Sequence, residues 1–397
     1  MDSAELLALL SPTGLDLLDG LPPYDPGAVV ATVSDLRARG HAPEVVSAVL
    51  GQSRLRARAR PKFGEFADRM LFTEAGLEQA TRLGVAAHHA RRFRDAGIAH
   101  VVDLGCGIGG DALAFAALEL QVTAVERDEV TAAVASFNLA PFPEATVVQG
   151  DAETTDPGDA GGAFLDPARR TSGHSRTRRL ADPADWSPSL DLAFGLGERL
   201  PTGVKLGPGI DRELLPDGWE WQWISVDREV VEAGVWSGPL ARPGVGRSAL
   251  VVGASGAAAE LTGAADAEDA PVRELGTWLY EPDGAVIRAR LIGDLARDLG
   301  AGMLSPDIAY LTADERVETP FAQAFRVVEA FPLDERTLRK ELRTRGIGRL
   351  EVKKRGVDVD PAAFRTRMQL RGTEQATLVL TRVAGRHTAL LCERARA

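Results

Sequence analysis

The sequence predicts an α/β fold in which a parallel sheet, covered by helices, follows a helical region and precedes a small α+β domain. Two observations predict it. Short apolar runs alternate with helical stretches through the middle of the chain, as they do in parallel sheets. One of these runs ends in glycines at residues 105–110 and is followed by a helical stretch, which is the pattern of a nucleotide-binding α/β unit.

These patterns divide the chain into four segments. Residues 1–98 are predicted to be helical, because apolar residues recur there at helical spacing. Residues 99–253 contain the apolar runs and the glycines, and they form the predicted sheet. Residues 254–270 are small and acidic, which is typical of a linker. Residues 271–397 mix short strands with helices and predict the α+β domain.

A basic run in the first segment, from Arg54 to Lys62, has most of its charges two residues apart. On a helix this spacing spreads the charges around the surface, whereas in an extended arm it puts them on one side. The run is therefore either a solvated helix face, the usual explanation, or an arm that contacts phosphate groups.

The most informative stretch reads Val-Val-Asp-Leu-Gly-Cys-Gly-Ile-Gly-Gly over residues 101–110. An apolar strand ends there in a loop whose backbone approaches a ligand closely, since a Cβ would block the approach and such turns use positive φ. The next predicted strand, Gln121 to Val125, ends in Glu126, which is placed to bind the hydroxyls of a ribose. Enzymes that use NAD carry a similar loop, so a dehydrogenase is the alternative interpretation.

The spacing of the glycines favours another family. The D-L-G-C-G-I-G-G form resembles the first motif of class I S-adenosylmethionine (SAM) methyltransferases, whereas the NAD pattern is G-x-G-x-x-G. In the methyltransferases the loop passes under the methionine part, and acids after the second and third strands hold the ribose and the adenine amino group. The resemblance therefore implies SAM as cofactor and a Rossmann-like, seven-stranded core. The cofactor-binding residues that it implies are Asp103, Gly105, Cys106, Gly107, Gly109, Glu126, Arg127, Asp151 and Ala152.

The fourth predicted strand, Ala163 to Leu165, ends in Asp166-Pro167-Ala168-Arg169. Ligands of open α/β sheets lie at the carboxyl ends of the strands, so Asp166 and Pro167 should face the methyl donor. Methyltransferases that act on base nitrogens carry Asp or Asn, then Pro-Pro and an aromatic residue, at this point. The resemblance implies that Asp166 and a prolyl carbonyl accept hydrogen bonds from the attacking amine.

The aromatic residue of that motif is missing here, which leaves base stacking to Arg169, whose guanidinium could replace the ring. The catalytic residues expected from the motif are thus Asp166, Pro167 and Arg169. The alternative is that Asp166 caps a turn and that Arg169 is solvated.

Two wider resemblances extend beyond the motifs. Residues 100–170 resemble the methyltransferase core of trimethylguanosine synthase, which methylates an exocyclic guanine amine. The whole chain is similar to a bacterial group of class I SAM methyltransferases with a C-terminal THUMP-like domain. The segments that carry this second likeness are Glu78-Gln79-Ala80-Thr81, the D-P-A-R-R run, residues 205–210 (K-L-G-P-G-I) and residues 352–356 (V-K-K-R-G). It also implies that strands at 220–226 and 248–252 form the antiparallel hairpin that ends such cores.

Charge is distributed unevenly along the chain. Residues 319–397 contain 17 Lys and Arg against 9 Asp and Glu, a net charge of +8, although the whole chain carries −11. A basic module on an acidic body predicts a local contact with a polyanion. The residues expected to contact RNA are Arg339, Lys340, Arg343, Lys353, Lys354 and Arg355.

Length and composition limit the remaining possibilities. A chain of 397 residues is long enough for two or three domains. Two cysteines exclude a disulfide framework and suit a reducing compartment, and the six histidines show no metal-ligand spacing. The N-terminus lacks the basic start of a signal peptide, and no apolar run approaches the ~18 residues of a membrane span. We therefore expect a cytoplasmic protein without a metal.

The sequence predicts a SAM-dependent methyltransferase that transfers a methyl group to a base nitrogen of RNA by in-line SN2 displacement. Its main catalytic task would be to position the nucleophile, with little acid–base work. Two alternatives stay open. A small-molecule or protein methyltransferase is favoured by the missing aromatic residue, and a non-catalytic protein would bind SAM and RNA without turnover.

Overall fold

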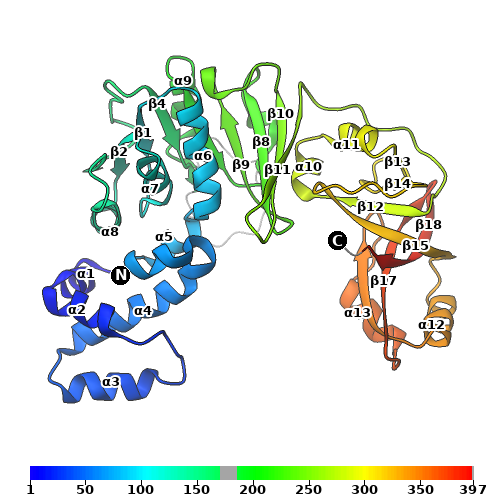
Figure 1. The fold of residues 1–397 in the computed structure, drawn as a ribbon, viewed down its shortest axis with the longest axis horizontal. Coiled ribbons are helices and arrows are strands. Elements are labelled where there is room, and N and C mark those ends of the chain that lie inside the picture. The colour runs from blue at the N-terminus through cyan, green and yellow to red at the C-terminus, as the bar shows by residue number, and fades with distance from the viewer. Residues whose placement is uncertain (170–185, 396–397) are drawn as a thin grey trace. The chain divides into compact units, whose positions relative to one another are not determined.

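The structure is a computed structural model that describes residues 1–169 and 186–395 (Figure 1). The chain divides into two compact units. The first contains Met1–Trp219 and Gly234–Ala241, and the second contains Glu220–Ala233 and Arg242–Ala397. No helix in the described part of the chain is both long and apolar enough to cross a membrane.

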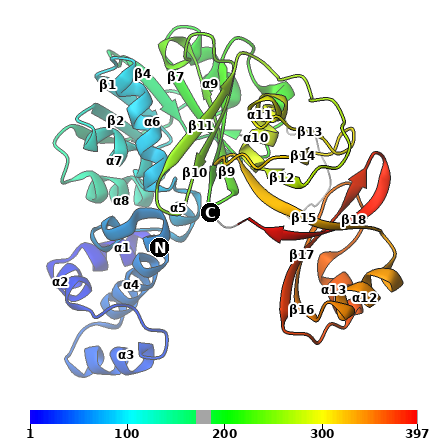
Figure 2. The same cartoon turned by 45° about the vertical axis from the view of Figure 1, so that its right-hand side comes forward.

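The N-terminal region is helical, as predicted. Its elements are α1 (Ser3–Leu10), α2 (Pro12–Gly20), α3 (Val29–Ala38), α4 (Pro43–Phe63), η1 (Gly64–Arg69), α5 (Glu74–Gln79) and α6 (Leu83–Asp95). Local capping explains two of the starts: Asp2 and Glu5 form a capping box at α1, and the Thr73 hydroxyl accepts the Gly76 N–H at α5. α5 lies at the foot of α6 in both views (Figures 1 and 2).

The basic run lies in the second half of helix α4, and each of its arginines pairs with an acidic residue of the N-terminal region. Arg54 and Arg58 both pair with Glu74. Arg56 pairs with Asp19 at 3.1 Å and Arg60 with Asp68 at 2.7 Å. The extended arm that the spacing also allowed is wrong, because residues 54–62 lie within helix α4.

The first unit holds five parallel strands in the order β3-β2-β1-β4-β7. Helices follow three of them and cover the sheet. The strands are β1 (His100–Leu104), β2 (Gln121–Glu126), β3 (Ala145–Gln149), β4 (Gly162–Leu165) and β7 (Thr202–Leu206), and the helices are α7 (Gly110–Ala117), α8 (Glu129–Leu139) and α9 (Leu190–Gly197). Because the pairs are parallel, the carboxyl ends of all five strands lie at one edge of the sheet. The order in which successive strands are added to the sheet reverses between β1 and β4, and ligands of such sheets usually bind at this point.

One hydrophobic core joins the N-terminal helices to this sheet. Phe63 and Phe72 belong to the same buried cluster as Ile108 of the glycine loop and Phe115 of α7. Asn138 of α8 adds a polar connection. Its side chain accepts the Leu71 N–H at 2.7 Å and donates to the carbonyls of Leu71 and Ile108 at 3.0 and 2.9 Å.

The full sheet has nine strands, in the order β11-β10-β8-β9-β7-β4-β1-β2-β3, where seven were expected. The second unit supplies β8 (Glu220–Val226), β10 (Arg247–Val252) and β11 (Ala258–Gly263), and β9 (Glu229–Trp236) is divided between the units. The expected linker was wrong for residues 258–263, which form β11 and pair antiparallel with β10. Its small residues do not prevent pairing at the edge of a sheet.

The expected hairpin was also wrong in its partners. β8 and β10 pair in parallel, with Trp223 opposite Ala249. β8 instead neighbours β9 and is joined to it by Asp227 and Arg228, both at positive φ. Two left-handed residues form the tight turn that antiparallel hairpins favour, but neither residue is glycine, so the usual sequence signal of such a turn is absent.

The rest of the second unit is built on a seven-stranded sheet with the order β13-β14-β12-β15-β18-β17-β16 (Figure 2). Its strands are β12 (Trp278–Pro282), β13 (Gly302–Met303), β14 (Leu311–Ala313), β15 (Ala322–Pro332), β16 (Ile347–Lys354), β17 (Glu374–Val383) and β18 (Arg386–Arg394). The helices are α10 (Gly284–Arg288), α11 (Ile292–Asp298), α12 (Glu335–Thr344) and α13 (Pro361–Met368). Leu338, Leu342, Phe364 and Met368 anchor α12 and α13 in one cluster with residues of β16, β17 and β18. The predicted α+β character is confirmed.

We predict that Asn138→Ala lowers the free energy of unfolding by about 3 kcal/mol, because it removes the partner of three buried backbone groups. Urea denaturation measures the change. The matched control is Ser136→Ala in the same helix, since that hydroxyl donates only to the Ala132 carbonyl one turn earlier. Equal losses from the two variants would contradict a connecting role for Asn138.

Candidate active site

A cavity of about 330 Å³ lies where the parallel strands of the first unit end. Its lining comes from the glycine loop after β1, from the ends of β2, β3 and β4, from residues 76–81, and from Ser187 and Pro188. Eight residues that the sequence predicted for the site are among its lining: Gly105, Cys106, Gly107, Glu126, Arg127, Asp151, Ala152 and Asp166. Asp103, Gly109 and Pro167 do not line it.

The glycine loop has the backbone that its sequence predicted. Gly105, Gly107 and Gly109 have φ of 86°, 55° and 83°, which side chains rarely tolerate. The N–H groups of Gly105 and Cys106 both donate to the Val125 carbonyl, at 2.9 and 3.0 Å, and so fix the loop to the end of β2. Gly109 serves the turn itself, since it is the left-handed N-cap residue that precedes α7.

Two acids end the next strands at the cavity. The Glu126 carboxylate accepts the Gly107 N–H at 3.1 Å and the Asp128 N–H at 2.9 Å, so it is held against the glycine loop. Asp151, after β3, lies 3.9 Å from the Arg127 guanidinium, and both side chains stay well exposed. A carboxylate beside the loop and a second one a strand away can bind a diol and an amine, as a nucleoside requires.

Asp103 lies beneath the loop and not in the cavity. It is 1% exposed, and its Oδ2 atom has no hydrogen-bond partner among the residues that the structure describes. Burial, followed by the charges of Asp111 and Asp166, raises the pKa of this carboxyl well above its usual range. Burial likewise raises the pKa of the Cys106 thiol, as do the charges of Asp103 and Glu126, and this disfavours the thiolate form that a nucleophile needs.

Asp166 follows β4 and lines the cavity with its side chain 29% exposed. Pro167 is buried behind it. Arg169 belongs to the short strand β5 (Ala168–Arg169), which pairs antiparallel with β6 (Trp186–Ser187). The prediction that Arg169 stacks on a base concerns its side chain, which lies outside the described part of the structure, as do residues 170–185.

Sequence reasoning missed one wall of the cavity. Gly76, Gln79, Ala80 and Thr81 come from α5 and the turn after it, far before the glycine loop in the chain. Gly76 packs so closely on the loop that an added Cβ would lie 2.3 Å from Ile108 Cγ2. The Glu78-Gln79-Ala80-Thr81 motif had marked this segment as a family feature, but no residue pattern gave it a role.

Two lysines hold that wall. Lys62, at the end of α4, donates to the carbonyls of Leu77, Glu78 and Ala80, each at 2.8 Å. Burial, followed by the charges of Arg82 and Lys205, lowers the pKa of Lys62 to about 8, against the opposing effect of Glu78. Lys205, on β7, reaches the same segment from the sheet and donates to Thr81 Oγ1 at 2.9 Å.

Thr81 also connects to a buried acid. Its hydroxyl donates to Asp111 Oδ2 at 2.6 Å, and Asp111 Oδ1 lies 2.9 Å from His89 Nδ1. Burial alone would raise the pKa of Asp111, but the hydrogen bond and charge of His89, with Lys205 and Thr81, outweigh it and lower that pKa. Across the described ranges, no group of three His, Cys, Asp or Glu side chains is arranged to hold a metal ion.

Comparison with known proteins identifies relatives of the whole chain and of its ends. A family model described as THUMP domain-like matches residues 322–394, and one for a domain of unknown function matches residues 2–59. Two uncharacterized S-adenosylmethionine-dependent methyltransferases of Mycobacterium tuberculosis, from strains CDC 1551 and H37Rv, are each 36% identical over 359 residues. The alignment covers 88% of this chain and 95% of theirs.

The fold has a counterpart among solved structures. The crystal structure of a proposed methyltransferase from Porphyromonas gingivalis W83 aligns with a TM-score of 0.73 at 22% identity, covering 94% of this chain and 100% of the other. The cavity fits the cofactor of the M. tuberculosis relatives, because its glycine loop leaves room for a ligand at Gly107, and acids end both neighbouring strands.

We predict that Gly107→Ala weakens SAM binding at least tenfold, because the methyl group would occupy open space at the cavity lining, where no protein atom lies within 4 Å. The matched control is Gly64→Ala: its φ of 58° resembles the 55° of Gly107, and its Cβ also meets nothing within 4 Å, but it does not line the cavity. Both variants should lose stability because each places a Cβ at positive φ, and Gly64→Ala should lose more than about 1 kcal/mol because the ψ of Gly64 is −135°, outside the left-handed helical region. Calorimetric titration with SAM measures the affinities, and equal SAM affinity in the two variants would contradict the prediction.

Proposed function

This chain belongs to the S-adenosylmethionine-dependent methyltransferases and ends in a THUMP-like domain, and from that premise we propose that it methylates a base nitrogen of RNA. The observation that carries the proposal is the position of Asp166. Its carboxylate lines the cofactor cavity at the carboxyl end of β4 and is followed by Pro167, as in methyltransferases that act on base nitrogens. We also expect the reaction to take place in the cytoplasm.

In this proposal the protein binds and orients both reactants. Bound SAM supplies a methyl group on a positively charged sulfur. Glu126 binds the ribose hydroxyls, Asp151 the adenine amino group, and the glycine loop supports the methionine part. The Asp166 carboxylate and the Pro167 carbonyl accept the N–H groups of the substrate amine. They hold its lone pair in line with the methyl group, and Asp166 can accept the proton that the nitrogen releases.

The THUMP-like domain supports RNA as the substrate class. On α12, the exposed side chains of Arg336 and Lys340 recur at helical spacing on one face, where Arg336 also interacts electrostatically with Asp334. Exposed cations on one helix face suit the phosphates of a nucleic acid backbone. Arg343 lies one turn further along α12 and is exposed as well. Its guanidinium donates to the Gln369 carbonyl at 3.1 Å.

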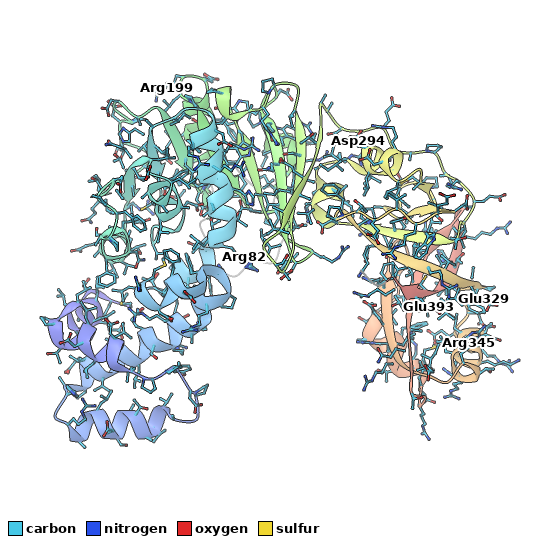
Figure 3. All side chains as sticks on the ribbon, viewed as in Figure 1. Arg82, Arg199, Asp294, Glu329, Arg345 and Glu393 are labelled. Atoms are coloured by element: carbon cyan, nitrogen blue, oxygen red, sulfur yellow. The ribbon has the colours of Figure 1, made fainter. Side chains whose placement is uncertain are left out.

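Other cations of residues 319–397 interact with groups inside the domain. Lys353 pairs with Glu281 at 2.7 Å, and Arg355 lies over the Tyr310 ring at 5.4 Å. Arg345 pairs with Glu329 at 2.5 Å (Figure 3). The surface that we propose for RNA is therefore centred on α12, with Arg336, Arg339, Lys340 and Arg343, and includes Lys354 at the exposed edge strand β16.

A small-molecule or protein substrate remains the second candidate. The observation that favours it is Ala168, which stands where methyltransferases acting on base nitrogens carry the second proline, with Arg169 in the aromatic position. A substrate without a planar base would not need the ring to stack on.

We predict that the protein transfers tritium from labelled SAM to total cellular RNA, and that Asp166→Ala abolishes transfer while SAM affinity stays within about threefold. The variant loses the acceptor that orients the amine but keeps the loop and acids that bind the cofactor. Scintillation counting with and without RNase measures transfer, and calorimetry measures affinity. Asp159→Ala is the matched control, because that side chain is 97% exposed and does not line the cavity.

Each failure has a separate meaning. Label that resists RNase, or that appears only in protein or small molecules, would show that the substrate is a protein or a small molecule and not RNA. Retained transfer to RNA by Asp166→Ala would show that Asp166 does not orient the nucleophile, although the RNA substrate would stand.

We further predict that reversing the charges of Arg336 and Lys340 to Glu weakens RNA binding by at least tenfold and reduces the salt dependence of binding by about two ion equivalents. The control reverses Arg382 and Arg386, two equally exposed cations at the β17–β18 connection, and so changes the net charge by the same amount. Fluorescence anisotropy at several salt concentrations measures both. Equal losses for the two double variants would mean that net charge alone attracts the RNA.

A further inference from the structure

A chain of polar side chains lies behind the cavity wall. It begins at Asp166, whose Oδ2 pairs with the Lys205 ammonium. Lys205 donates to Thr81 Oγ1 at 2.9 Å and lies 3.4 Å from the Gln79 carbonyl. Lys205 has only 10% of its side chain exposed and does not line the cavity itself, whereas Asp166 and Thr81 both do.

The sheet fixes the position of this lysine. β4 and β7 are parallel neighbours in which Leu165 lies opposite Val204, so the next residues, Asp166 and Lys205, lie side by side at the strand ends. Lys205 is therefore held by the register of two buried strands. Its position does not depend on the loop that follows β7.

The Lys205 ammonium lies among three acidic side chains. Asp166, Asp111 and Asp103 all interact with it, and burial raises the pKa of the Asp103 carboxyl well above its usual range. Asp111 is stabilised first by His89 and then by Lys205. A buried ammonium is stable only when acceptors surround it, and here those acceptors are the groups of the cavity wall.

The geometry points to Lys205 as a positioning residue that holds the Asp166 carboxylate in one orientation and ties it, through Thr81 and Gln79, to the wall formed by residues 79–81. The inference rests on the proposed function, in which Asp166 orients the substrate amine. Lys205 touches neither reactant in this arrangement. It acts on the reaction only through Asp166, because Lys62 holds the carbonyls of Leu77, Glu78 and Ala80 independently of Lys205.

This role predicts a loss of turnover without a loss of cofactor binding. Lys205→Met keeps the length of the side chain but removes its charge, and should lower kcat about a hundredfold, the expected effect of misplacing a positioning group by about 1 Å. The KM and calorimetric Kd for SAM should stay within about threefold. Lys205→Arg keeps a donor and a charge next to Asp166, and should restore at least a tenth of the wild-type kcat.

A double-mutant cycle with Asp166→Asn separates positioning from structure. If Lys205 acts only through Asp166, the double variant Asp166→Asn/Lys205→Met should be no slower than Asp166→Asn alone. Arg92→Met is the structural control. Arg92 packs over Trp236 at 4.6 Å and donates to the Leu240 carbonyl at 2.9 Å, away from the cavity lining, so its loss should lower Tm and leave kcat unchanged.

The outcomes are distinguishable, with transfer of labelled methyl to RNA as the activity. Full activity of Asp166→Asn would overturn the role of Asp166 in the proposed function, and with it the role of Lys205. An inactive Asp166→Asn beside a fully active Lys205→Met would overturn the inference alone, as would losses that multiply in the double variant. If Lys205→Met fails to fold, Lys205→Gln takes its place, because it removes the charge but keeps a polar side chain, and a wild-type kcat in Lys205→Gln would contradict the inference.

Discussion

The active site depends on one constraint: five parallel strands end at the same edge of a sheet. Residues as far apart in the chain as Gly105 and Lys205 meet there because the register of β1, β2, β3, β4 and β7 aligns their ends. Each end contributes a group that the local sequence cannot place. The glycine loop supplies backbone, β2 and β3 supply acids, and β4 supplies Asp166. Parallel pairing thus turns a series of separate motifs into one cavity.

The N-terminal helices form part of the active site. They share a hydrophobic core with the sheet, and Asn138 connects Leu71 to the glycine loop by buried hydrogen bonds. Lys62 and Lys205 then hold the wall at residues 77–81 from two sides. A buried ammonium needs several acceptors, and the free carbonyls at the end of a short helix provide them. The cavity therefore requires residues from the first quarter of the chain.

Basic residues in this protein have two different uses. The arginines of α4 pair with nearby carboxylates, and Lys353 and Arg345 do the same in the THUMP-like region. On α12, by contrast, Arg336, Lys340 and Arg343 are exposed at the surface. A count of charges along the sequence does not separate these uses, because whether a cation is neutralised depends on residues that lie far away in the chain.

The sequence by itself determined the nucleotide-binding unit, the SAM cofactor, the helical N-terminal region and eight residues of the cavity. Glycines at residues 105–109 and acids at strand ends are local requirements of a close backbone approach, so they are visible in the chain. Only the tertiary structure decided the cavity wall at residues 76–81 and the ion pair between Lys205 and Asp166. It also decided which acidic residues pair with the arginines of the run 54–62, and it added strands beyond the expected seven. These features depend on strand register and on partners distant in sequence. A non-glycine turn at Asp227 and Arg228 and a strand made of small residues carry no local signal that periodicity could detect.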